Sequence, residues 1–167
     1  MMSFEVHSCY GATSLAQVWA ALGHIREHQL EPRIQYVPHK VTDTHCVHEL
    51  QYETALMLAP LIGTRVLLRE DMVLFTDDDA QKIIVKTVSQ NYDTRAFPYM
   101  MTETVFRPGA DPTTIESTLQ VEWGLSEYIP DLLVTRLTSF GQSLYGEATA
   151  RLEESLGVVK ASTRCAK

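Results

Sequence analysis

The sequence predicts an α+β fold in which a curled seven-stranded antiparallel sheet grips one long C-terminal helix, with a short helix after strand one. Three observations predict it: an apolar stripe at helical spacing runs through residues 127–157, seven segments before it have the features of strands, and turn signals separate these segments. Successive strands joined by short turns pair antiparallel, and a twisted sheet of this size curls. Its concave side would hold the long helix.

The long helix is predicted over residues 127–157, with Gly157 as its stop signal, and would span about 45 Å. Gly141 and Gly146 each cost roughly 1 kcal/mol relative to alanine, so we expect a close backbone approach or a bend there. Apolar residues recur at steps of three and four, which places them on one helical face: Ile129, Leu132, Leu133, Leu137, Phe140, Leu144, Ala148, Leu152 and Leu156.

The first strand is predicted over residues 3–10, where apolar and polar side chains alternate. A short helix follows, with its cap at Thr13 or Ser14 and its end at Gly23, and we expect residues 24–32 to be a connection. Six further strands, bounded by turn signals, are expected at residues 34–41, 45–54, 65–75, 82–90, 99–107 and 113–123.

This order of elements is that of the helix-grip, or START-like, architecture, in which a cavity commonly remains between sheet and helix. We expect a single domain over residues 1–157 and a flexible tail over residues 158–167.

The composition excludes some classes of function. With 167 residues and a formal charge of -7, the chain lacks the basic stripe that nucleic-acid binding requires, so we expect no nucleic-acid partner. Its three cysteines are odd in number and far apart, which favours free thiols over a disulfide framework. The N-terminus has no charged segment followed by an apolar one, so no obvious cleavable signal is expected.

Metal-ligand residue types crowd together only at residues 45–49. On a strand, Cys46 and His48 share one face while His45 and Glu49 share the other, so at most two could bind a metal from the same side. We therefore expect a strand with polar outward residues, Cys46 as a small core residue, and neither metal nor cofactor.

The specific catalytic motifs are absent: the sequence has no Gly-rich phosphate loop, no G-x-S-x-G string and no C-x-x-C pair. A cyclase or hydrolase would need an acid and a base lining the cavity. No catalytic residue is predicted, because the spacing of the candidates singles out no acid and base pair among them. The candidates are the histidines and the carboxylates Glu49, Glu70, Asp71, Glu103, Glu116 and Glu122.

Residues 55–63 interrupt two strands with an almost entirely apolar insertion, which a solvent-facing loop would not be expected to contain. Two interpretations stay open: a short helix that plugs the end of the core, or a mobile lid that touches membrane or lipid. The insertion is about half the length of a membrane-spanning helix. The lid interpretation assigns lipid binding to Leu56, Met57, Leu58, Leu61 and Ile62.

Several local strings fit one known family in place and order: the Leu61-Ile62-Gly63 string, the string at residues 103–108 with its turn at 111–112, and the string at 120–124 before the long helix. With the order of elements, they make the chain resemble the PRELI/slowmo family of lipid-transfer proteins over residues 6–156.

The resemblance implies a protein of the mitochondrial intermembrane space that shuttles an anionic phospholipid, such as phosphatidic acid or phosphatidylserine, between membranes. It further implies transient contact with a membrane surface, a small twin-cysteine helical-hairpin protein as partner, and residues 55–63 as the lid over the lipid pocket. A cytoplasmic location is the alternative.

The chain departs from the family at both places where basic residues are usual. Residues 24–28 replace an aromatic-Pro-Asn-Pro string, and residues 126–131 lack the lysines of members that favour phosphatidic acid. We assign the lipid head group to the cations that could substitute for them, His24, Arg26 and Arg136.

Three functions therefore compete. A lipid carrier should contain an apolar cavity with a polar end and a lid, whereas a START-like enzyme of the cyclase or hydrolase kind should show a perturbed acid and base inside the cavity. A non-enzymatic interaction module should have a filled core.

Overall fold

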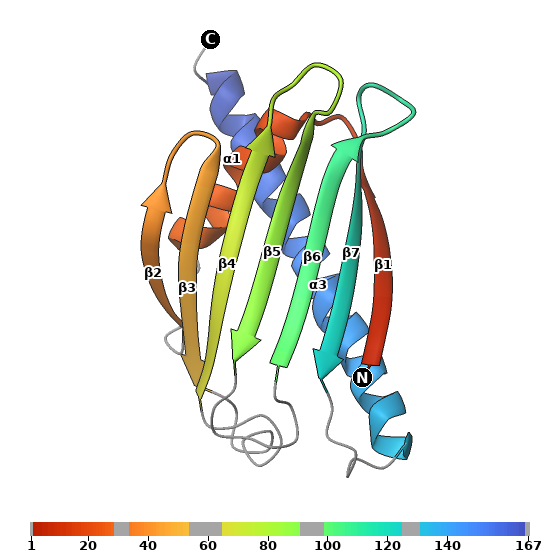
Figure 1. The fold of residues 1–167 in the computed structure, drawn as a ribbon. Helices are drawn as coiled ribbons and strands as arrows, with labels where there is room; N and C mark the ends of the chain where they lie inside the picture. Colours follow the sequence, from red (N-terminus) through yellow and green to blue (C-terminus); the bar gives the residue numbers. More distant parts are fainter. Residues whose placement is uncertain (1, 29–33, 54–64, 91–98, 125–130, 166–167) are drawn as a thin grey trace.

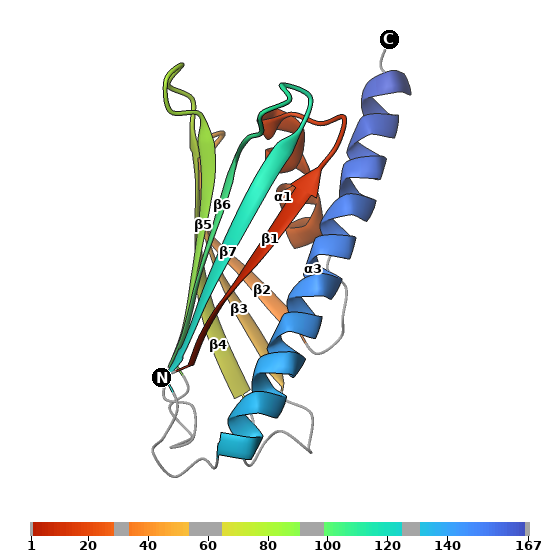
Figure 2. The ribbon, with the colours of Figure 1, turned by 90° about the vertical axis from the view of Figure 1, so that its right-hand side faces the viewer.

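A computed structural model describes residues 2–28, 34–53, 65–90, 99–124 and 131–165 of the chain. Both described helices lie on the concave side of a single curved sheet (Figures 1 and 2). The elements in chain order are β1 (Met2–Tyr10), α1 (Leu15–His28), β2 (Ile34–Val41), β3 (His45–Glu53), β4 (Arg65–Phe75), β5 (Lys82–Gln90), β6 (Tyr99–Pro108), β7 (Ile115–Gly124) and α3 (Asp131–Cys165).

The sheet has the order β1-β7-β6-β5-β4-β3-β2, and all its neighbouring strands are antiparallel. Consecutive strands from β2 to β7 are neighbours in a meander. The first strand, β1, pairs with the last, β7, from Met2 opposite Trp123 to Tyr10 opposite Ile115. The sheet stays open, with β1 and β2 at its edges. The predicted seven-stranded antiparallel sheet and the long helix on its concave face are confirmed.

α1 begins where the sequence predicts. Ser14 accepts a hydrogen bond from the Gln17 amide at 3.3 Å, and the Gln17 side chain accepts one from the Ser14 amide at 3.1 Å. This reciprocal pair is a capping box, which satisfies two amides at the start of the helix. Val18 and Ala21, three residues apart on the apolar face of the helix, are fully buried.

α1 does not end at Gly23, as predicted, but continues to His28. The additional turn is held by tertiary contacts, because Ile25 packs against the core and Arg26 forms an ion pair with Glu70 of β4. These contacts outweigh the low helix propensity of one glycine. Residues 24–28 are therefore helical, and the connection between α1 and β2 is shorter than expected.

The predicted end of the long helix at Gly157 is also wrong, because α3 continues to Cys165. Val159 packs against the main core, and the Lys160 ammonium donates a hydrogen bond to the Gly11 carbonyl oxygen at 3.3 Å. Residues 158–165 are thus helical, where the sequence predicted a tail. Residues 127–130 lie outside the described residues.

The apolar stripe of α3 is confirmed at Leu152 and Leu156, which are buried. It is wrong at Leu132, which is 73% exposed. The side chains of Leu133, Leu137, Phe140 and Leu144 lie outside the described ones. Among the described residues of the first half, those that meet the sheet include Val134, Thr138, Gly141 and Tyr145.

Gly141 lies where the α3 backbone comes close to side chains of the sheet. A Cβ atom at this position would lie 2.9 Å from the Trp123 ring and 3.0 Å from the Phe4 ring. The expected close approach is therefore confirmed here. At Gly146, by contrast, a Cβ atom would meet nothing within 4 Å.

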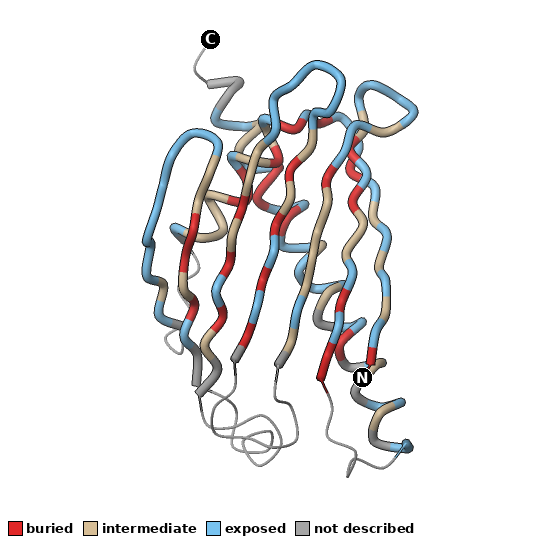
Figure 3. Tube along the Cα trace, in the orientation of Figure 1, coloured by how far each residue is buried: buried red, intermediate tan, exposed pale blue. Residues whose placement is uncertain are grey.

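Two clusters of buried side chains hold α3 against the sheet. The larger one joins α1 and the C-terminal half of α3 to the strands, and the smaller one surrounds Met2, Val121 and Trp123. Figure 3 shows buried residues alternating with less buried ones along β4, β5 and β7. Neither described helix combines the length and the apolarity that crossing a membrane demands.

We expect Gly141→Ala to lower the free energy of unfolding by about 1–3 kcal/mol relative to Gly146→Ala, because its added methyl group overpacks the contact with Trp123 and Phe4. Gly146→Ala adds the same methyl group in open space and should stabilise the helix by up to about 1 kcal/mol. Urea denaturation followed by circular dichroism measures both. Equal effects of the two substitutions would contradict the close approach.

Candidate ligand-binding pocket

A cavity of about 240 Å³ lies between the concave face of the sheet and the two helices. It is lined by α1, by α3 and by strands β1, β4, β5, β6 and β7, so it occupies the position where the sequence predicted one. Its apolar wall is formed by Leu22, Ile25, Val85, Phe106, Leu119 and Leu152.

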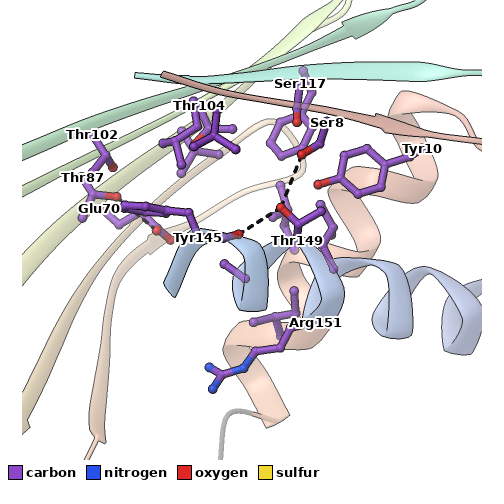
Figure 4. Close-up of a pocket in the computed structure, with 18 of the residues that line it drawn as sticks. Ser8, Tyr10, Glu70, Thr87, Thr102, Thr104, Ser117, Tyr145, Thr149 and Arg151 are labelled. Atoms are coloured by element: carbon purple, nitrogen blue, oxygen red, sulfur yellow. Dashed lines mark hydrogen bonds between the residues drawn. The ribbon is translucent and has the colours of Figure 1, made fainter. Parts of the chain in front are cut away.

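The remaining lining is rich in hydroxyl groups, which come from the strands and from α3 (Figure 4). The Ser8 and Thr149 hydroxyl oxygens are 3.4 Å apart, and the Thr149 hydroxyl also donates to the Tyr145 carbonyl oxygen at 3.0 Å. The hydroxyl-bearing lining residues of the strands are Ser8, Tyr10, Thr87, Thr102, Thr104 and Ser117.

This polar layer follows from the alternation of each strand. In β5, Ile83, Val85, Thr87 and Ser89 are the buried residues, so the inward face changes from aliphatic to hydroxyl side chains along the strand. Serine and threonine side chains are smaller than those of leucine, isoleucine and phenylalanine, and their hydroxyl groups offer hydrogen bonds to a polar ligand atom. The alternation in the sequence carries this signal, but the binding residues predicted from the sequence did not include these hydroxyl side chains.

One ion pair lies at the wall of the pocket. The Arg26 guanidinium of α1 donates two hydrogen bonds to the Glu70 carboxylate of β4, from Nε at 2.5 Å and from Nη2 at 2.6 Å. The Thr87 hydroxyl donates a longer one to the same carboxylate at 3.4 Å. The exposed fractions of the two charged side chains are 14% for Arg26 and 5% for Glu70.

The spacing of the carboxylates in the sequence did not distinguish Glu70 from the other candidates. Its position within β4 carries a stronger signal, because Leu68, Glu70 and Met72 are two residues apart and therefore share the inward face. A carboxylate between two buried apolar residues needs a partner. That signal identifies Glu70, but it does not identify Arg26, which is 44 residues away in sequence.

A buried histidine lies beside this ion pair. His48 is 3% exposed and opposite Glu70 in the register of β3 and β4, and its Nδ1 is 2.8 Å from the Tyr36 hydroxyl oxygen. Burial lowers the pKa of His48 below its ordinary value of 6.5, and the nearby charges of Glu70 and Arg26 act on it in opposite directions. His48 is therefore neutral at physiological pH.

An aromatic cluster packs near the N-terminal half of α3. Tyr145 packs against Phe4 with ring centroids 5.8 Å apart, and Phe4 meets Trp123 edge to face at 6.0 Å. Burial raises the pKa of the Tyr145 hydroxyl to about 12, so Tyr145 stays protonated.

The residues predicted to bind the lipid head group do not gather at one point. Arg26 lines the pocket, His24 is partly buried on α1 without lining it, and Arg136 is exposed on α3 away from the pocket. The predicted lid residues Leu56, Met57, Leu58, Leu61 and Ile62 lie outside the described residues.

The side chains at residues 45–49 divide between the two faces of β3 as predicted. His45 Nε2 lies 2.9 Å from an Asp71 carboxylate oxygen on one face, while His48 bonds Tyr36 on the other. Cys46 is partly buried and packs against the main core. Within the described part of the chain, no three His, Cys, Asp or Glu residues come together as a metal site would require.

Solved structures place this architecture among known folds. The ZhuI aromatase/cyclase from Streptomyces sp. R1128 matches 99% of this chain and 98% of its own length, with 14% identity and a TM-score of 0.57. Human STARD10 matches 92% of this chain over 62% of its own length, with 10% identity and a TM-score of 0.58. The protein Ara h 8.0201 matches 96% and 98% of the two chains, with 13% identity and a TM-score of 0.54.

The chain has the helix-grip fold. At these identities the likeness shows the fold alone, and the matched proteins include both an aromatase/cyclase and a STARD protein. No protein-family model matches the sequence, and no curated protein sequence matches it. Membership of the PRELI/slowmo family stays a prediction.

We expect His48 to make stability depend on pH. Because its pKa is lowered by folding, the unfolded chain binds more protons than the folded one between the folded pKa and 6.5, so this contribution to stability is lost as pH falls through that window. His48→Gln should therefore reduce the loss of unfolding free energy between about pH 7.5 and about pH 5. Urea denaturation across that range measures it.

His7→Gln is the control for this experiment, because it removes a histidine whose side chain is 70% exposed. An unchanged pH dependence in His48→Gln would show that folding does not lower the pKa of His48.

Proposed function

We propose that the protein binds a lipid, holds an apolar part of that lipid in the pocket, and carries the lipid between membranes. The observation that carries this proposal is the cavity between the sheet and the helices, with its apolar wall and its layer of hydroxyl groups. A pocket of this kind buries a hydrophobic body and orients it with a few polar contacts. A module that only binds other proteins would have its core filled.

The size of the pocket limits which part of the lipid enters it. Its volume of about 240 Å³ is below the roughly 300–1,000 Å³ of pockets that enclose a whole small molecule. We therefore propose that part of one acyl chain enters and that the head group stays at the mouth. The anionic phospholipid, the intermembrane space and the twin-cysteine partner implied by the family resemblance remain proposals of the same kind.

An enzyme is the second candidate, favoured by one observation: a buried carboxylate, Glu70, lies at the pocket wall beside an arginine and close to a histidine. A general base must reach the proton that it removes. Glu70 instead directs both carboxylate oxygens to the Arg26 guanidinium. This pairing supports a carrier, and turnover of a bound ligand during incubation would favour the enzyme.

Filling the pocket should abolish lipid binding. Ser117→Phe places a large side chain into the cavity, whereas Thr118→Phe places the same side chain on the outward face of β7. We expect copurified lipid, detected by native mass spectrometry, to be lost in the first variant and retained in the second. Equal retention would contradict binding in this pocket, and thermal unfolding of both variants verifies that they are folded.

A substitution in the apolar insertion tests transfer between membranes separately from binding. If residues 55–63 are a lid, Leu58→Asp should abolish extraction of phospholipid from vesicles and leave the thermal midpoint nearly unchanged. A buried plug would lose several kcal/mol of stability to the same carboxylate, with an equal loss of binding. A fluorescent-lipid transfer assay with donor and acceptor vesicles, together with thermal unfolding, separates the two.

A further inference from the structure

The pocket already contains an anion and its counter-ion. Glu70 engages Arg26 through two short hydrogen bonds, which is the bidentate geometry with which arginine binds a carboxylate or phosphate of a ligand. The Glu70 carboxylate thus occupies the position on Arg26 that an anionic ligand would take. The pair contributes no net charge to the pocket.

Burial makes this occupation hard to reverse. Glu70 is 5% exposed, and Thr87 adds a third hydrogen bond to its carboxylate. An anionic group that displaced Glu70 would leave two negative charges beside one guanidinium, at a position where the side chains of the pair are only 14% and 5% exposed. Like charges repel strongly in such surroundings.

The other cation at the pocket does not change this balance. Arg151 of α3 lines the cavity, but it is exposed, and Figure 4 shows its guanidinium on the side of α3 away from the hydroxyl groups of the strands. His48, the histidine opposite Glu70, is held neutral by burial.

We propose that Glu70 is a specificity-determining residue that makes the pocket select uncharged ligand groups over anionic ones. The inference rests on the proposed function, and it names the chemical class of the group that enters the cavity: an apolar chain or ring that carries a hydroxyl or carbonyl oxygen. The head group of an anionic lipid stays outside, and its uncharged part enters.

The hydrogen-bonding capacity of the pocket fits such an oxygen. A guanidinium has five N–H donors, of which Glu70 takes two. Within the described residues, no other side chain forms a hydrogen bond with Arg26, so its remaining donors are available to an uncharged acceptor. The hydroxyls of Thr102 and Thr104 line the same cavity and can both donate and accept.

Two competitors with the same chain test the selection. The fluorescent reporter N-phenyl-1-naphthylamine is bound to the full-length protein and displaced with decan-1-ol or with decane-1-sulfonate, which carries a permanent charge. We expect the alcohol to compete at least about tenfold more strongly than the sulfonate. A sulfonate that competes as well as the alcohol would overturn the proposal.

Glu70→Gln then frees Arg26. We expect this variant to bind the sulfonate roughly tenfold more tightly than the wild type does, with little change for the alcohol. The double variant Glu70→Gln, Arg26→Met should lose that gain, because the cation is gone. Glu103→Gln is the matched control, since it removes a carboxylate paired with Lys86 on the outer face of the sheet and should leave both competitors unchanged.

The outcomes separate this inference from the proposed function. Suppose that the reporter binds and copurified lipid displaces it, but Glu70→Gln increases the affinity for the sulfonate no more than Glu103→Gln does. The pocket then binds lipid, and Glu70 does not select against anionic groups. If the reporter does not bind and no lipid copurifies, the proposed function is wrong, and so is this inference. Should Glu70→Gln not fold, the competition on the wild type still decides, because a sulfonate that competes as well as the alcohol overturns the selection of uncharged groups.

Discussion

The structure depends on how α3 is held over the curved sheet. At one place Gly141 lets the helix backbone approach Phe4 and Trp123, and at the other Leu152 and Leu156 pack against the core under α1. A long helix laid across a concave surface touches it at such points and spans the hollow between them (Figure 2). Because the strands present short hydroxyl side chains there, the hollow is not filled.

This arrangement works against the best packing of the core. Aliphatic side chains in place of the hydroxyl groups would fill the cavity and bury more apolar surface. A buried ion pair such as Arg26 with Glu70 is often no more stabilising than well-packed apolar residues of similar volume. Departures from good packing that gather in one pocket are typical of a binding site.

The strands were predictable because their signal is local. Alternation of apolar and polar residues, interrupted by turns, identifies each strand, and short connections make neighbours antiparallel. The same alternation would have placed Glu70 on the inward face of β4. The ends of α1 and α3 were not predictable from Gly23 and Gly157, because distant contacts extend both helices past their stop signals.

The sequence by itself determined the number of strands and the antiparallel pairing of successive ones, because periodicity and turn residues act over a few neighbouring positions. The order of elements then gave the helix on the concave side and the expectation of a cavity. Only the tertiary structure decided what the cavity contains. Arg26 and Glu70 meet because the curl of the sheet brings α1 over β4, and Thr149 meets Ser8 because α3 crosses β1. Such contacts depend on how separate elements are oriented in space, which no local pattern encodes.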